Sequence, residues 1–208
     1  MSARQQLLRI LAKNSFRLGD FQLSSGGRSD YYVDCRTTTL DALGASLTAR
    51  VVLDEIRRRE WAPEAIGGMT LGADPIVATV AMLSAQESQS RAEASDGRGG
   101  AFIHGFLVRK AEKTHGTGQR IEGFRRKGAR VVIVDDVCTT GASTVQAIEA
   151  AREAGFTVAG VMCLVEREEA GGRAAVEKAA APAPFIALFK AAEVRQAHLR
   201  LKSQPAGK

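Results

Sequence analysis

The sequence has few of the residues from which metal centres, disulfide frameworks and membrane spans are built. Its 208 residues include three cysteines, Cys35, Cys138 and Cys163, and no two of them have Cys-x-x-Cys spacing. This spacing indicates neither a zinc site nor a disulfide framework, and a reducing compartment is the simplest setting for scattered thiols. No apolar run reaches the length of a membrane span, and residues 1–14 lack the core of a signal peptide. We therefore expect a cytoplasmic protein that does not enter a membrane.

Aromatic residues are also scarce, with two tyrosines and one tryptophan, although the net charge of +6 raises the question of a nucleic-acid partner. The positive residues are dispersed, and the clusters Arg57–Arg59 and Arg125–Lys127 are short. Few side chains are available to stack on bases, so the pattern does not favour nucleic acid. A site for a small polyanion explains the same excess of positive charge.

The length suits one α/β domain over residues 1–208, because strand-like and helix-like segments alternate along the chain. The segments expected to form strands are 16–36 (a hairpin), 65–68, 101–108, 131–134, 157–165 and 184–189. The expected helices are 1–14, 41–60, 74–83, 144–154, 173–181 and the start of 190–208. Residues 84–100 are polar and have no hydrophobic period, which indicates a mobile surface insertion. The order of elements predicts a mostly parallel sheet flanked by helices.

The most informative stretch, Val131–Ser143, reads VVIVDDVCTTGAS. Its four β-branched residues predict a strand buried on both faces, and its small residues lead into a helix. Ligands of such sheets bind beyond the carboxyl ends of strands, where a helix N-terminus offers unpaired N–H groups to a phosphate. Thr139, Thr140 and Ser143 add hydroxyl donors, and Gly141 lets the backbone approach closely.

Asp135 and Asp136 follow the apolar part of this strand and suit a different part of a ligand. Two carboxylates repel a phosphate, but they accept hydrogen bonds from a sugar diol, directly or through water bound to Mg²⁺. The stretch therefore predicts a phosphate site next to a ribose site. The alternative is an ordinary strand-to-helix turn whose acidic residues are solvated or cap the helix.

A second stretch, Arg109–Gly118, reads RKAEKTHGTG. It has no hydrophobic period, and two glycines at its end are plausible hinges. Its basic residues and its histidine are Arg109, Lys110, Lys113 and His115. Such a loop suits a polyanionic leaving group, whereas the alternative is a solvated basic loop.

Val131–Ser143 resembles the phosphoribosyl-pyrophosphate (PRPP) signature of the type I phosphoribosyltransferases, which include purine salvage enzymes and non-catalytic regulators. Arg109–Gly118 closely resembles the mobile catalytic loop of one branch, the orotate phosphoribosyltransferases. Phe16–Arg36 is similar to the hood with which that branch encloses the pyrimidine, so a hood is expected over about residues 1–40. The resemblance covers roughly residues 16–189, with 84–100 as the main interruption.

This resemblance implies the type I phosphoribosyltransferase fold, with the hood over the carboxyl edge of the sheet, and a glycosyltransferase reaction. Orotate and PRPP would give orotidine 5′-phosphate and pyrophosphate in de novo pyrimidine biosynthesis, with Mg²⁺ held through PRPP and water. In the family the working unit is a homodimer. The loop 109–118 of one subunit serves the PRPP of its neighbour.

By the same resemblance, the catalytic residues are Lys113, His115, Asp135 and Asp136. The residues expected to bind PRPP are Arg109, Lys110, Lys113, His115, Asp135, Asp136, Val137, Cys138, Thr139, Thr140, Gly141, Ala142 and Ser143. Those expected to bind orotate are Thr139 and Arg167. Arg167 follows the predicted strand 157–165, and its planar fork suits a carboxylate. The alternative for Arg167 is a surface pair with a neighbouring glutamate.

Two positions depart from the family pattern: Ser24 in the hood turn and Gly72 in the pyrophosphate loop stand where other members have lysine. Two rival functions follow from the signature alone. They are transfer to a purine or another base, and PRPP sensing without catalysis. Transfer to another base is disfavoured by the hood and by Arg167. PRPP sensing without catalysis is disfavoured by the loop Arg109–Gly118 and by the lack of a separate DNA-binding element.

Overall fold

The computed structural model describes residues 1–22, 27–94, 102–110 and 120–203. Its main sheet has six strands in the order β5-β4-β3-β6-β7-β8, and every neighbouring pair is parallel except β4 with β5. The strands are β3 (Ala65–Met69), β4 (His104–Val108), β5 (Ile121–Gly123), β6 (Arg130–Cys138), β7 (Thr157–Glu166) and β8 (Phe185–Lys190). The mostly parallel sheet expected from the sequence is confirmed.

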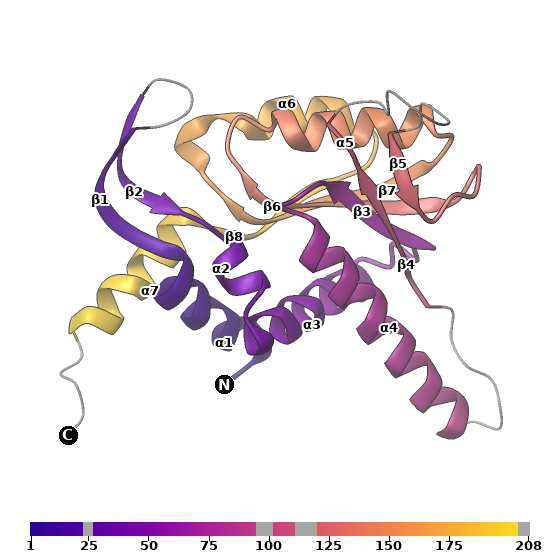
Figure 1. The fold of residues 1–208 in the computed structure, drawn as a ribbon, viewed down its shortest axis with the longest axis horizontal. Coiled ribbons are helices and arrows are strands. Elements are labelled where there is room, and N and C mark those ends of the chain that lie inside the picture. Colours follow the sequence, from indigo (N-terminus) through magenta and orange to yellow (C-terminus); the bar gives the residue numbers. More distant parts are fainter. Residues whose placement is uncertain (23–26, 95–101, 111–119, 204–208) are drawn as a thin grey trace.

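Helices cover both faces of this sheet (Figure 1). One face carries α1 (Ala3–Ile10), α3 (Ala42–Arg58), α4 (Asp74–Ala94) and α7 (Ala191–Ser203), and the other carries α5 (Ala142–Glu153) and α6 (Gly172–Ala180). Strand β6 contributes to both cores: Val132 and Val134 pack with the first set, and Val131 and Ile133 with the second. A strand buried on both faces needs a continuous apolar run, which is the pattern seen in the sequence. None of the helices in the described ranges is long and apolar enough to cross a membrane.

The predicted N-terminal hairpin is confirmed as a separate two-stranded antiparallel sheet. Its strands are β1 (Phe16–Gln22) and β2 (Arg28–Val33), preceded by a π-helical turn, η1 (Leu11–Ser15), and followed by a short helix, α2 (Arg36–Thr39). Phe16 stacks on Tyr31 with ring centres 5.1 Å apart and contacts His198 of α7, so apolar packing anchors the base of the hairpin. Figure 1 shows the hairpin rising beside α7. Ser24 lies outside the described residues.

Residues 84–94 are the second half of helix α4, and the expectation of an aperiodic insertion beginning at residue 84 was wrong. Ser84 and Ser88 are buried. The Oγ atom of Ser84 accepts a hydrogen bond from the backbone N–H of Ile103 at 3.0 Å, so the helix packs against the segment that leads into β4. Residues 95–101 lie outside the described residues.

Ion pairs fix this half of α4 to its neighbour α3. Glu87, whose side chain is only 16% exposed, pairs with both Arg50 and Arg57. Serines and charged residues make these contacts where an apolar stripe would be expected. Hydrophobic periodicity therefore does not predict this half of the helix.

Candidate functional site

A cavity of about 1310 Å³ opens at the carboxyl ends of β3, β6 and β7. Its walls come from strand β2 of the hairpin, helix α2, the loop after β3, the turn between β6 and α5, and the segment after β7. The carboxyl edge of a parallel sheet is where ligands of α/β proteins bind. Of the residues singled out in the sequence, those that line the cavity are Lys110, Asp135, Asp136, Val137, Thr139, Thr140, Ser143 and Arg167.

Other predicted site residues lie elsewhere or cannot be placed. Arg109 lies 3.5 Å from Glu122 in an ion pair, and Cys138 is buried in the core on the α5 side of the sheet. Gly141 and Ala142 stand at the start of α5, and their positions are not among those lining the cavity. Lys113, His115 and the two glycines of the basic loop lie outside the described residues.

Asp135 and Asp136 lie within strand β6, which continues to Cys138 and does not end before them. Asp135 is 6% exposed. Its Oδ2 accepts a hydrogen bond from the hydroxyl of Thr144 at 2.6 Å, and its Oδ1 accepts one from the backbone N–H of Asp136 at 3.0 Å. Burial raises the pKa of Asp135 to about 7, since a carboxylate loses hydration there. Both of its oxygens therefore have partners inside the protein.

Asp136 is the more accessible carboxylate of the two. Burial raises its pKa, while a hydrogen bond from the backbone N–H of Val137, at 2.9 Å, and the charge of Arg36 act in the opposite direction. The loop after β3 presses against it: a Cβ atom added to Gly72 would lie 2.4 Å from Asp136 Oδ1. A side chain at position 72 would therefore require the Asp136 carboxylate or the loop to shift.

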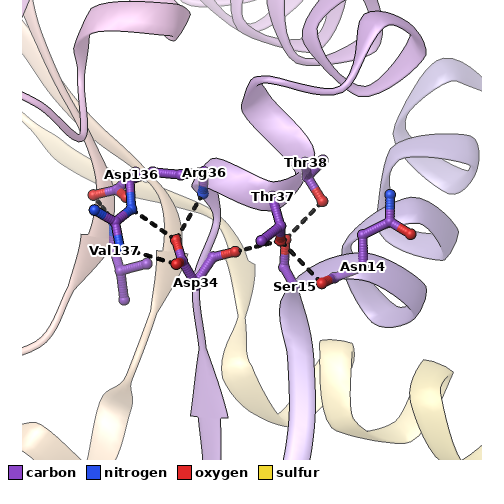
Figure 2. Close-up of polar contacts among 8 residues, drawn as sticks. All are labelled: Asn14, Ser15, Asp34, Arg36, Thr37, Thr38, Asp136 and Val137. Carbon is purple, nitrogen blue, oxygen red and sulfur yellow. Dashed lines mark hydrogen bonds and ion pairs between the residues drawn. The ribbon is translucent and has the colours of Figure 1, made fainter.

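Arg36, at the base of the hairpin, lies on the same side of the site as Asp136 and acts on its charge (Figure 2). Asp34 holds its guanidinium through two parallel hydrogen bonds, both of 2.9 Å, which fix its orientation. Ser15 shares a hydrogen bond of 2.6 Å with Thr38, so α2 is tied in turn to η1. Arg36 was not among the residues predicted for the site. Its only local signal is the Asp-x-Arg spacing directly after the hairpin.

The turn from β6 to α5 is shaped for an anion. Gly141 precedes the helix with φ of +78°, a conformation that glycine adopts readily, and no side chain caps the first N–H groups of α5. Thr139, Thr140 and Ser143 add hydroxyls to this end of the cavity. An uncapped helix N-terminus surrounded by hydroxyls suits a phosphate.

The start of α6 supports the same turn from behind. A Cβ atom added to Gly172 would lie 2.1 Å from the carbonyl oxygen of Thr139 and 2.6 Å from the backbone nitrogen of Gly141. The backbone of Gly172 therefore lies in direct contact with the anion-binding turn. This contact links that turn to the segment that carries Arg167.

Arg167, directly after β7, is buried at 6% exposure and yet lines the cavity. Its Nε donates to the hydroxyl oxygen of Tyr31 at 3.2 Å, and its Nη2 donates to Ser29 Oγ at 3.0 Å. The guanidinium carbon lies 4.5 Å from the centre of the Tyr31 ring, in a cation–π contact. Arg167 does pair with a neighbouring glutamate, as the alternative expected, but it is buried and joins the hairpin to the main sheet and does not lie on the surface.

Glu169, in the short 3₁₀ turn η2 (Glu168–Ala170), completes this network. Its Oε1 accepts hydrogen bonds from Nε of Arg167, at 3.0 Å, and from the hydroxyl of Tyr31, and it lies 3.0 Å from Nη2 of Arg167 in an ion pair. Burial and the neighbouring carboxylate raise the pKa of Tyr31 to about 12, so its hydroxyl stays protonated as a donor. Tyr31 and Ser29 were not predicted to contact Arg167, because only the fold brings them to it. Glu169 is two residues from Arg167 and was considered only as a partner on the surface.

A divalent cation would find few protein ligands in this cavity. In the part of the chain that the structure describes, no group of three or more His, Cys, Asp or Glu residues is arranged to hold a metal. Mg²⁺ commonly uses one or two carboxylates and completes its shell with waters and phosphate oxygens. Asp136 fits that mode of binding, whereas Asp135 is engaged with Thr144.

A family model, related sequences and solved structures of known proteins all match this chain, and they agree with one another. A family model described as the phosphoribosyl transferase domain matches residues 105–179. The orotate phosphoribosyltransferase of Aquifex aeolicus (strain VF5) is 40% identical over 93% of this chain and 98% of that protein. That of Thermosynechococcus vestitus is 41% identical over 92% of each. The crystal structure of Mycobacterium tuberculosis H37Rv orotate phosphoribosyltransferase in complex with PRPP is 28% identical, with a TM-score of 0.70 over 93% of this chain and 99% of that one.

Proposed function

The chain belongs to the orotate phosphoribosyltransferase family, and from that premise we propose the part that each wall of the cavity plays. The reaction is the transfer of a phosphoribosyl group from PRPP to orotate, which gives orotidine 5′-phosphate and pyrophosphate in pyrimidine biosynthesis. The bond between ribose C1 and the pyrophosphate oxygen breaks as N1 of orotate bonds to C1. The observation that carries the assignment is one cavity with an uncapped helix N-terminus, an acidic pair and a buried arginine.

The 5′-phosphate of PRPP binds at the start of α5. The backbone N–H groups there and the hydroxyls of Thr139, Thr140 and Ser143 supply donors, and Val137, Cys138, Gly141 and Ala142 complete the turn. The positive end of the helix adds to the attraction. Gly172 keeps the turn in place from the other side.

The ribose lies over Asp136, whose carboxylate accepts hydrogen bonds from the sugar diol. Asp135 stands behind it and fixes it through the backbone hydrogen bond between the two residues. Bound with PRPP, Mg²⁺ would neutralise charge that develops on the pyrophosphate. Asp136 and the phosphate oxygens, with water, are the ligands that we assign to it.

Orotate lies between Arg167, Tyr31 and Thr139. A planar guanidinium matches the geometry of a carboxylate, and its stacking on Tyr31 keeps its plane fixed. The hairpin supplies Tyr31 and Ser29, so it covers the base and limits the access of water. The hairpin, the sheet and the helices then act as one domain.

The loop after β4 supplies the remaining positive charge. Lys110 already lines the cavity, and we assign Arg109, Lys113 and His115 to the departing pyrophosphate. Closure of this loop would exclude water, which otherwise attacks the same carbon.

We also propose that the protein works as a cytoplasmic homodimer whose loops are shared between the two sites. Large apolar side chains are exposed along the segment from α2 to α4, as expected for an interface. They are Leu40, Leu43, Leu71 and Met82. A two-fold assembly makes the exchange of loops reciprocal.

The test is the loss of orotate absorbance on addition of the protein, PRPP and Mg²⁺. Orotate should be consumed only when PRPP is present, and pyrophosphate should appear in equal amount. Adenine and guanine in place of orotate are the controls for transfer to another base. Turnover of a purine without turnover of orotate, or binding of PRPP without either, would contradict the proposed function.

A further inference from the structure

Arg167 is a buried cation whose anionic partner in this structure comes from the protein itself. Among the described residues, Glu169 is the one that forms an ion pair with it, and this pair involves both Nε and Nη2. An unpaired charge in a buried position is costly, because it has lost its hydration. Glu169 therefore offsets that cost from within the protein.

The two partners of this pair differ in their freedom to move. The side chain of Arg167 is 7% exposed and is held by Tyr31 and Ser29, whereas that of Glu169 is 54% exposed. Glu169 can therefore turn into solvent when another anion takes its place at Arg167, whereas Arg167 itself stays fixed. Burial alone would raise the pKa of Glu169, but the hydrogen bonds from Tyr31 and Arg167 outweigh it and lower the pKa, so Glu169 is ionised at neutral pH.

We infer that Glu169 competes with the carboxylate of the pyrimidine substrate for Arg167, and so sets both the affinity and the selectivity of the base site. This inference rests on the proposed function, in which Arg167 binds orotate. Orotate brings its own carboxylate, so it restores the ion pair that it displaces. A pyrimidine without a carboxylate, such as uracil, leaves either Glu169 in place or Arg167 unpaired.

Glu169→Gln tests the inference, because glutamine keeps the size of the side chain and can still accept a hydrogen bond from Tyr31. The Michaelis constant for orotate should fall about two- to fivefold, the range that a half-exposed ion pair supports. The Michaelis constant for PRPP should not change. The inhibition constant of uracil, measured against orotate, should also stay constant.

Glu168→Gln is the matched control. Glu168 is the preceding residue, it is half exposed, and it pairs with Lys190 at 2.6 Å, away from the cavity. This variant removes the same charge one residue away and should leave both Michaelis constants unchanged.

Three results would overturn the inference. An unchanged or raised Michaelis constant for orotate in Glu169→Gln would mean that Glu169 orients Arg167 and does not compete. An equal gain in affinity for uracil in Glu169→Gln would mean that Glu169 only blocks the base site sterically. An equal fall of the Michaelis constant for orotate in Glu168→Gln would mean that the loss of any negative charge nearby is responsible. If the wild-type protein does not consume orotate, it is the proposed function that fails. If it does, but Arg167→Ala leaves the orotate constant unchanged, the role of Arg167 fails.

Discussion

Asp135 and Asp136 are neighbours in the chain, yet the fold gives their carboxylates different surroundings. Asp135 is enclosed and bonded to Thr144, whereas Asp136 faces the cavity beside Arg36 and Gly72. A carboxylate that is enclosed holds its proton more tightly, and one that is exposed to a ligand can bind it. In the proposed function, Asp135 thus supports the site and Asp136 contacts the ligand.

The buried carboxylate of Asp135 should make stability depend on pH. Its folded pKa of about 7 lies above the ordinary value near 4, so its proton stabilises the folded state at low pH. That contribution is lost as the pH rises through about 7. The Asp135→Asn variant has no proton to lose at this position. The difference in free energy of unfolding, variant minus wild type, should therefore become more favourable to the variant as the pH rises from about 4 to about 8. Urea unfolding of both proteins across that pH range measures this difference. A difference that stays constant with pH would contradict the prediction.

Arg167→Ala should damage the use of orotate far more than the binding of PRPP. The loss of a charge-assisted contact to a carboxylate corresponds to about tenfold to a hundredfold in the Michaelis constant for orotate. Steady-state kinetics with each substrate varied in turn measure the two effects. Equal losses for both substrates would show that Arg167 supports the fold of the site and does not recognise the base.

At the scale of elements, the site depends on contacts between segments that are far apart in the chain. The start of α6 packs on the turn before α5, and α4 packs on α3 through Glu87. The first contact shapes the anion-binding turn directly. The second holds the helix that follows the loop containing Gly72.

Gly172→Ala should weaken PRPP binding, because its Cβ would lie 2.1 Å from the carbonyl oxygen of Thr139 and force the turn to shift. The Michaelis constant for PRPP should rise about tenfold or more, while that for orotate changes less. Gly171→Ala is the control. Its φ of +71° makes alanine costly there, but its Cβ would meet nothing within 4 Å. Gly171→Ala should therefore lower the melting temperature without raising the Michaelis constant for PRPP.

Ser88→Pro should destabilise the protein by about 3 kcal/mol, because proline interrupts a packed helix at this position. Ser88→Ala, which keeps the helix, should cost about 1 kcal/mol or less. The two variants are compared by thermal and urea unfolding. An aperiodic surface segment would tolerate both changes equally, so equal stabilities would contradict the assignment of residues 84–94 to α4.

At the scale of the whole molecule, the arginines of the cavity are largely neutralised by the protein's own carboxylates. Arg167 and Arg36 already have carboxylate partners in the cavity, namely Glu169 and Asp34. In the proposed function the basic loop supplies positive charge to the pyrophosphate, and the proposed dimer shares this loop between its subunits. Sharing the loop makes each site dependent on two chains.

Mixing two inactive variants tests this arrangement. Lys113→Ala and Asp136→Asn should each be nearly inactive alone. After exchange of subunits, each mixed dimer holds one site with intact Asp136 and an intact neighbouring loop, so about a quarter of wild-type activity should return. Native mass spectrometry confirms the exchange. Confirmed exchange without recovery would show that each loop serves its own subunit.

Features that depend on contiguous residues could be predicted from the sequence alone. The apolar run Val131–Val134 predicts a strand buried on both faces, and the residues from Asp135 to Ser143 predict a site at its carboxyl end. Strand, turn and helix follow one another directly here, so the local sequence pattern is enough to predict all three. The hairpin was predictable for the same reason, because its two strands are close together in the sequence.

The tertiary structure decided the features that depend on distant partners. Arg167 meets Tyr31 and Ser29 across more than a hundred residues of chain, and no local pattern records that contact. The burial of Asp135 depends on Thr144 and the surrounding core, and the helix at 84–94 depends on the arginines of α3. Burial and pairing are properties of the space around a side chain. The sequence determines which chemical groups the site can use, and the packing of the fold determines which of them face the ligand and which face one another.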